Sequence, residues 1–102
     1  KFKCAVNNYS KKEILIASHI VAWKDSNNEE RLDVDNGILL SPTYDALFDQ
    51  RLISFENNGK IILTKALLNS NYASIGVTGK ESIANLSSGN IPYLERHREN
   101  ID

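Results

Sequence analysis

The sequence of 102 residues has no methionine, a single cysteine and only two prolines. One cysteine forms no disulfide within the chain and cannot complete a four-ligand zinc site, so no structural zinc is expected. We predict instead that Cys4 packs as a small buried hydrophobic residue. No apolar run approaches the roughly 18 residues of a membrane span, so we expect no membrane partner.

An excess of charge of one sign is also missing. Twelve Lys and Arg residues stand against thirteen Asp and Glu residues, a formal net charge of −1. This balance excludes a strongly cationic groove as the main organising feature of the fold. The length suits one small domain, and the chain begins in strand-like sequence without a methionine. We therefore expect residues 1–102 to be a single domain, the C-terminal part of a longer protein.

The apolar pattern predicts an α+β fold. Strands are expected at residues 2–6, 13–20 and 37–40, with a polar loop without periodicity at 21–36. A helix at 43–50 should begin after Ser41-Pro42, since Ser is a favoured N-cap and Pro a favoured first helical residue. The Asn58-Gly59 pair predicts a hairpin of strands 52–55 and 60–63. Further helices are expected at 65–74, 80–86 and 93–100.

Four polar residues could together catalyse a hydrolysis reaction, and in chain order they are His19, Asn36, Asp45 and Asp49. His19 ends a predicted strand, and an imidazole can accept a proton from water near neutral pH. Asn36 precedes the next strand and could hold that ring through its side-chain or backbone carbonyl. Asp45 and Asp49 are four residues apart, so both project from one face of the helix and can bind Mg²⁺ or Mn²⁺. Each residue alone has an ordinary explanation, and only their order and spacing together favour a site.

The chain resembles the HNH endonucleases. The matching segments are L-I-A-S-H-I-V-A-W-K-D from residue 15, the run from residue 30 through N-G-I-L-L-S-P, Y-D-A-L-F-D from residue 44, and L-I-S-F from residue 52. They resemble most the branch with A-[AS]-H-I, N-G-L-L-L and [HD]-x-L-F-D that is common in bacterial restriction and defence enzymes. The resemblance implies a ββα-metal (His-Me finger) core, with the second hairpin and the C-terminal helices added to it.

The resemblance also implies roles for the residues. His19 takes the place of the general base, and Asn36 that of the residue that orients the base or its loop. The family's third His falls at Asp45, so the motif here is H-N-D, and Asp49 is a plausible second metal ligand. Ser18 stands where the family often has a metal-binding Asp or His, although Ser is a poor ligand. The implied cofactor is one divalent ion, Mg²⁺ or Mn²⁺.

Basic residues in or near the motif are candidates for DNA contact. Lys24, Arg31 and Arg51 could meet phosphates, and Trp23 could join them or pack over the finger. Arg96, His97 and Arg98 near the C-terminus are interpreted as an exposed helix face that complements the helix dipole, with a phosphate patch as the alternative.

The function expected is a metal-dependent DNA endonuclease, the cleavage module of a bacterial, cytoplasmic restriction or defence enzyme. Its partners would be double-stranded DNA and an N-terminal targeting domain, because a near-neutral chain has little cationic surplus for DNA binding. The oligomeric state is left open, and an oligomer is possible. The alternative is a degenerate HNH domain that binds nucleic acid or protein without cleaving. A small structural domain with accidental spacing is a third possibility, disfavoured by the length of the match.

Overall fold

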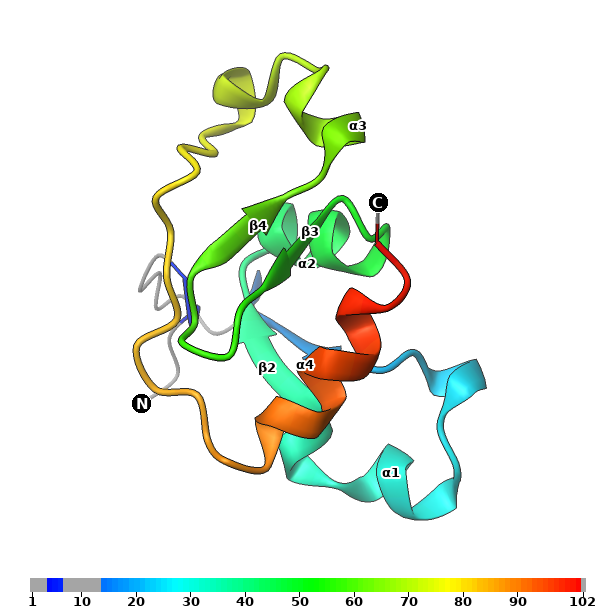
Figure 1. Ribbon diagram of the computed structural model, residues 1–102. Coiled ribbons are helices and arrows are strands. Elements are labelled where there is room, and N and C mark those ends of the chain that lie inside the picture. Colours follow the sequence, from blue (N-terminus) through cyan, green and yellow to red (C-terminus); the bar gives the residue numbers. More distant parts are fainter. Residues whose placement is uncertain (1–3, 7–13, 102) are drawn as a thin grey trace.

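The structure is a computed structural model that describes residues 4–6 and 14–101. Its helices and strands are β1 (Ile16–His19), α1 (Asn28–Leu32), β2 (Gly37–Leu40), α2 (Pro42–Asp49), β3 (Ile53–Phe55), β4 (Ile61–Leu63), α3 (Lys65–Leu68) and α4 (Asn90–Arg98). Strands β1 and β2 form one antiparallel sheet, and β3 and β4 form a second (Figure 1). The predicted α+β class is therefore confirmed.

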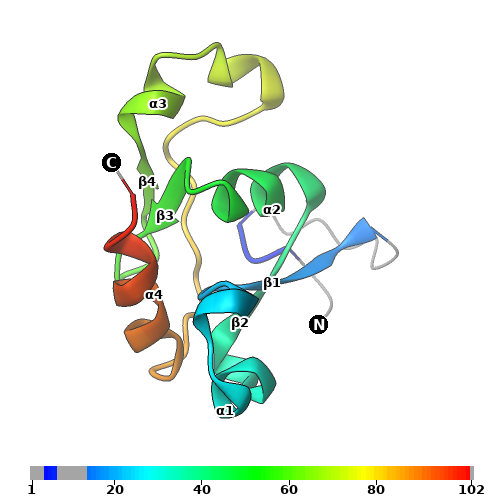
Figure 2. The ribbon, with the colours of Figure 1, turned by 90° about the vertical axis from the view of Figure 1, so that its right-hand side faces the viewer.

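The first hairpin and the helix after it form a ββα unit. Strand β1 pairs with β2 so that Ile16 lies opposite Leu40 and His19 opposite Gly37. Helix α2 begins at Pro42, the favoured first helical residue and one position before the predicted range 43–50, and lies across one side of this hairpin (Figure 2). Its buried side chains are Tyr44, Leu47 and Phe48. This spacing places one apolar stripe against the sheet and leaves the aspartates of the helix outside it.

The core joins both hairpins through α2 and α4. Leu40, Phe48, Ile53, Phe55 and Leu94 are at most 1% exposed. Burial of each such side chain stabilises the fold by about 1.5–3 kcal/mol relative to exposure. Cys4 is fully buried in the same cluster, with its Sγ 3.7 Å from Ser41 Oγ, which confirms the prediction for this residue.

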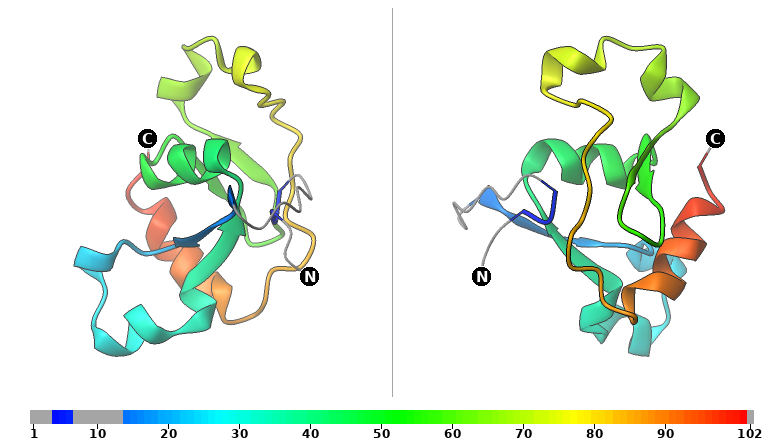
Figure 3. Two further views of the ribbon diagram at one scale, coloured as in Figure 1. Left: turned by 180° about the vertical axis from the view of Figure 1, so that it is seen from behind. Right: turned by 60° about the vertical axis from the view of Figure 1, so that its left-hand side comes forward.

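The second hairpin turns at the predicted Asn-Gly pair. Gly59 has a φ of 91°, and a Cβ there would collide with the carbonyl of Ile83. Only glycine meets both conditions without strain. Residues 77–89 then run back along the molecule from the α3 end to the start of α4 (Figure 3).

Several predicted elements are wrong or shorter. Of the predicted strand 2–6, residues 2 and 3 lie outside the described part, and residues 5 and 6 form a turn. Of the predicted strand 13–20, residues 14–20 are described, and the strand within them is the shorter β1. The loop 21–36 contains α1 and short 3₁₀ helices at Trp23–Asp25 and Val34–Asn36. Helix 65–74 divides into α3 and a 3₁₀ helix, Tyr72–Ile75.

The helix predicted at 80–86 is absent, because contacts distant in sequence hold this segment extended. Ile61 N–H donates to the carbonyl of Glu81 at 3.0 Å, and Ile83 N–H donates to that of Gly59 at 2.9 Å. The Glu81 carboxylate accepts hydrogen bonds from Tyr44 and Thr78. Burial raises the pKa of Glu81, but these bonds outweigh burial and hold that pKa below its usual range.

The exposed basic face expected on the last helix is also wrong. His97 is 6% exposed and stacks on Phe48 with ring centroids 4.0 Å apart. Its Nδ1 lies 2.7 Å from Ser54 Oγ, and its Nε2 lies 3.0 Å from the carbonyl of Phe48. Arg98 donates to the carbonyl of Phe55 at 2.8 Å. These side chains attach α4 to α2 and to β3.

The buried imidazole predicts a pH-dependent stability. Burial lowers the pKa of His97 below its usual 6.5, and the charges of Arg51 and Arg98 add to this effect. The unfolded chain therefore takes up this proton at higher pH than the fold does. The free energy of unfolding should fall as the pH drops below about 6.5, until the lowered pKa is passed.

Urea denaturation at pH 7.5, 6.5 and 5.5 measures this dependence. His97→Gln should flatten it, and His19→Ala controls for the other histidine. A wild-type slope that persists in His97→Gln would assign the dependence to other groups.

Among the described residues, no helix combines the length and apolar character needed to cross a membrane.

Candidate active site

His19 is the last residue of β1, and its side chain is exposed. Its ring forms a T-shaped pair with the ring of Trp23, with centroids 5.9 Å apart and planes at 79°. Within the part of the chain that the structure describes, no hydrogen bond to another residue is formed by the imidazole. Both ring nitrogens are therefore available to a water molecule or a ligand.

Asn36 is buried directly before β2, and its side chain holds the loop that follows His19. Its Oδ1 accepts from the backbone N–H of Val21 at 2.8 Å. Its Nδ2 donates to the carbonyl of Glu30 at 3.1 Å and to Ser26 Oγ at 3.4 Å. The backbone carbonyl of Asn36 accepts from Ile20 N–H at 3.2 Å. Asn36 thus positions the chain next to the histidine, and neither of its carbonyls contacts the ring.

The two aspartates of α2 lie beside β1. Ser18 is buried, and its hydroxyl donates to Asp45 Oδ1. This bond joins the residue before His19 to the helix across the ββα unit. Asp49 is exposed and lines a small hollow of about 20 Å³ together with His19, Arg51 and His97. A space of this size holds one water molecule.

The side chains around β1 and α2 offer few ligands to the expected divalent ion. No cluster of three or more His, Cys, Asp or Glu side chains is placed to hold a metal within residues 4–6 and 14–101. Mg²⁺ does not require such a cluster, because it commonly binds one or two carboxylates and completes its shell with water and phosphate. The carboxylates of Asp45 and Asp49 have the donor chemistry that suits a hard ion bound in this way.

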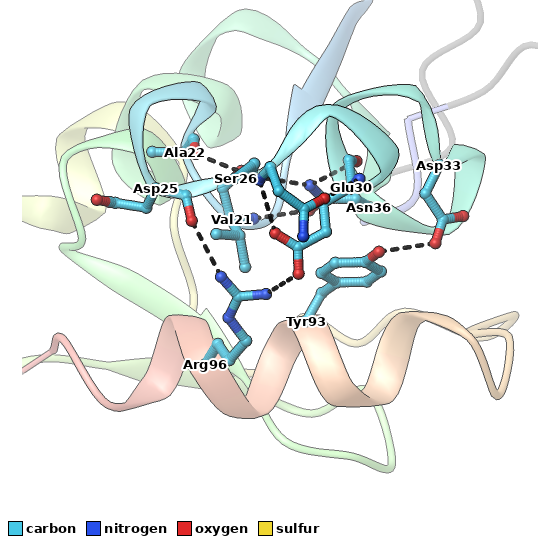
Figure 4. A network of polar contacts seen from close by, with 10 residues as sticks. Val21, Ala22, Asp25, Ser26, Glu30, Asp33, Asn36, Tyr93 and Arg96 are labelled. Atoms are coloured by element: carbon cyan, nitrogen blue, oxygen red, sulfur yellow. Dashed lines mark hydrogen bonds and ion pairs between the residues drawn. The ribbon is translucent and has the colours of Figure 1, made fainter.

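Side chains of helix α4 hold the loop between β1 and β2 in place through polar contacts (Figure 4). Arg96 Nη1 lies 2.6 Å from Glu30 Oε2, and its Nη2 donates to the carbonyl of Asp25 at 3.1 Å. The Tyr93 hydroxyl donates to Asp33 Oδ2 at 2.7 Å. The capping box between Asn27 and Glu30 starts α1 inside this loop. The loop is therefore fixed from both sides, by Asn36 and by α4.

These contacts shift several acid–base equilibria. The backbone N–H of Asn27, followed by Arg96, holds the pKa of Glu30 below its usual range. Tyr93 has the same effect on the pKa of Asp33. The Asp33 carboxylate in turn raises the pKa of Tyr93 to about 12. Glu30 and Asp33 are thus carboxylates occupied with holding the loop.

The basic residues predicted to contact DNA lie around His19. Arg31 places its guanidinium 4.6 Å from the ring centroid of Trp23 and donates through Nε to the carbonyl of the same residue at 2.9 Å. Trp23 is 58% exposed, so it packs over the loop only in part. Lys24 is exposed beside it. Arg51 follows α2 and faces the hollow shared with His19.

Comparison of the chain with models of known protein families establishes its family. The model of the HNH endonuclease family matches residues 4–56, just over half of the chain. The chain belongs to the HNH endonuclease family. The ββα unit of this HNH domain, with His19 at the end of β1 and Asn36 before β2, lies within the matched residues. HNH domains are typically nucleases that act on DNA, and they generally use a divalent metal ion. A search of curated proteins found no match.

Three residues of α4 have structural roles that differ from the sequence prediction, and all lie beyond the matched part of the HNH domain. Arg96 and His97 were predicted on an exposed face, and no role was predicted for Tyr93. The three residues have i, i+3, i+4 spacing, which places them on one helix face and is a signal for a shared packing surface. Basic residues near a helix end are usually exposed, and the burial of His97 departs from that rule.

Proposed function

We propose that this HNH domain is a metal-dependent DNA endonuclease that hydrolyses phosphodiester bonds, as the cleavage module of a restriction or defence enzyme. The observation that carries the proposal is the hollow shared by an exposed imidazole and a helix carboxylate, His19 and Asp49. A water molecule there would be within reach of a base and next to a carboxylate that suits a hard cation.

In this mechanism His19 accepts a proton from the attacking water. The water oxygen bonds to phosphorus, the bond from phosphorus to the 3′ oxygen breaks, and the leaving oxygen takes a proton from solvent. The products carry a 5′-phosphate and a 3′-hydroxyl. The ring of Trp23 packs against the imidazole of His19. Asn36 holds the backbone that follows His19.

Asp45 and Asp49 would hold the divalent ion, with Ser18 orienting Asp45 through its hydrogen bond. When bound, the ion supplies a positive charge for a phosphate oxygen and for the leaving oxygen. Lys24 and Arg31 would contact phosphates on either side of the cleaved bond. Such contacts give affinity without sequence preference, and a further targeting domain would supply the preference.

The direct test is incubation of the chain with supercoiled plasmid, with Mg²⁺, with Mn²⁺ and with a chelator. Nicked and linear DNA should appear only with the metal, and the nicks should be sealed by DNA ligase, which requires a 5′-phosphate and a 3′-hydroxyl. Cleavage that continues in the chelator contradicts metal dependence. Binding to a labelled duplex without cleavage favours the non-catalytic binding module, which the loss of a metal-binding residue at Ser18 also favours.

Replacement of Asp45 by Asn should weaken Mn²⁺ binding by about tenfold or more, since it removes a negative charge and an oxygen ligand. Isothermal titration calorimetry with Mn²⁺ alone measures this change without substrate. Glu95→Gln, an exposed carboxylate on α4, is the matched control and should leave the affinity unchanged. Equal affinity in wild type and Asp45→Asn would remove Asp45 from the ligand set.

A further inference from the structure

Arg51 has an unusual backbone. It directly follows α2 with a φ of 58°, and among the described residues it is the one non-glycine with a positive φ. Arg51 N–H donates to the carbonyl of Phe48 at 3.1 Å, and Leu52 N–H to that of Leu47 at 2.9 Å. This pair of bonds is the Schellman ending of a helix, in which the left-handed residue is usually glycine. An arginine there carries backbone strain that glycine would not.

The side chain of Arg51 is also incompletely paired. Its Nε is buried and has no hydrogen-bond partner among the described residues. Its Nη2 lies 3.7 Å from Asp25 Oδ2, a long and half-exposed ion pair. Buried donors are nearly always satisfied, so an unpaired one calls for an explanation. A ligand that enters beside Arg51 would provide one.

The position of Arg51 suggests which ligand. It lines the hollow that His19 and Asp49 share. It also lines an adjoining hollow of about 170 Å³, whose other charged residues are Asp25, Arg96 and Glu99. Arg96 is already held by Glu30 there. Among the described residues that line these two hollows, Arg51 is therefore the cation with hydrogen-bond donors left to offer.

We propose that Arg51 is a catalytic residue that donates hydrogen bonds to the non-bridging oxygens of the phosphate being cleaved. The inference rests on the proposed nuclease function and adds a residue to it. A guanidinium presents a planar fork of donors that matches phosphate oxygens. As water attacks phosphorus, negative charge develops on the non-bridging oxygens, and the guanidinium would lie beside them. A fixed hydrogen-bond donor at this position accelerates the reaction. Backbone strain is retained at this position because the side chain is needed.

Strain and function can be separated with three variants. Arg51→Gly removes the strain and the guanidinium, so its melting temperature should equal or exceed that of the wild type. Its single-turnover cleavage of a short duplex with Mn²⁺ should still fall by about 10²–10³-fold. Arg51→Gln keeps the strain and most of the side-chain length and should lose a similar factor. Arg51→Lys keeps the charge without the fork and should lie between them.

Asp25→Asn is the matched control. If Arg51 serves only to hold Asp25, both Arg51→Gly and Asp25→Asn should impair cleavage equally, and the proposal is overturned. We expect Asp25→Asn to cleave at the wild-type rate. Cleavage by folded Arg51→Gly within threefold of the wild type also overturns the proposal, while the nuclease function stands. A wild-type chain that binds the duplex but does not cleave it, with Mg²⁺ or Mn²⁺, overturns both.

Discussion

His19→Ala should lower metal-dependent plasmid cleavage by about 10²–10⁴-fold, the usual contribution of a general base. The effect on folding should be small. The His19 side chain is exposed, and its ring contact within the described chain is with Trp23. Substitutions at such surface positions usually change the free energy of unfolding by no more than about 0.5 kcal/mol. The expected variant is folded, binds Mn²⁺ and does not cleave.

Three measurements together test this expectation. Thermal denaturation establishes that the fold is intact, and calorimetry establishes that Mn²⁺ still binds. Cleavage is then measured with and without added imidazole, which can enter the space left by the side chain and restore part of the rate. His19→Gln, which keeps a polar side chain but offers no base, should be as inactive as His19→Ala. A nicking rate equal to that of the wild type in either variant would remove His19 from the role of base.

The start of α2 and the turn of the second hairpin could be predicted because their signals are local. Ser41-Pro42 marks the start of α2, and Asn58-Gly59 marks the second turn, each through the backbone conformation of those residues alone. The order of His19, Asn36 and Asp45 could be identified from the family resemblance, although their contacts could not. The resemblance implied that Asn36 orients the base or its loop, and the structure places its side chain against the loop.

The remaining features depend on contacts between distant parts of the chain. The extended course of residues 80–86 depends on hydrogen bonds to Gly59 and Ile61, which outweigh a local helix preference. Burial of His97 depends on Phe48 and Ser54, more than forty residues earlier. The left-handed conformation of Arg51 runs against the preference of its own residue type. Helix α1, in contrast, has a local signal from which it could have been predicted, the Asn27 and Glu30 capping box.

Asn36→Ala should have the largest effect on folding of the variants considered. The side chain is 1% exposed and makes three hydrogen bonds to the loop. Its removal leaves the buried N–H of Val21 without a partner, and the carbonyl of Glu30 keeps only the bond from Asp33 N–H. An unsatisfied buried donor costs about 1–3 kcal/mol and each further lost hydrogen bond about 1 kcal/mol, so we expect a loss of about 2–4 kcal/mol in the free energy of unfolding. Cleavage should fall with it, because the chain that follows His19 is released.

The same variant distinguishes two roles for Asn36. A residue that oriented the ring directly would reduce cleavage with little change in the urea midpoint. One that holds the loop reduces both together, and Asn36→Asp should do so as well. Aspartate keeps the acceptor for Val21 but turns an oxygen toward the carbonyl of Glu30, where the amide donated. Asn85→Ala, at an exposed asparagine, is the control. If Asn36→Ala keeps the wild-type midpoint but loses cleavage, Asn36 acts on the base, because a residue that only holds the loop cannot be removed without loss of stability.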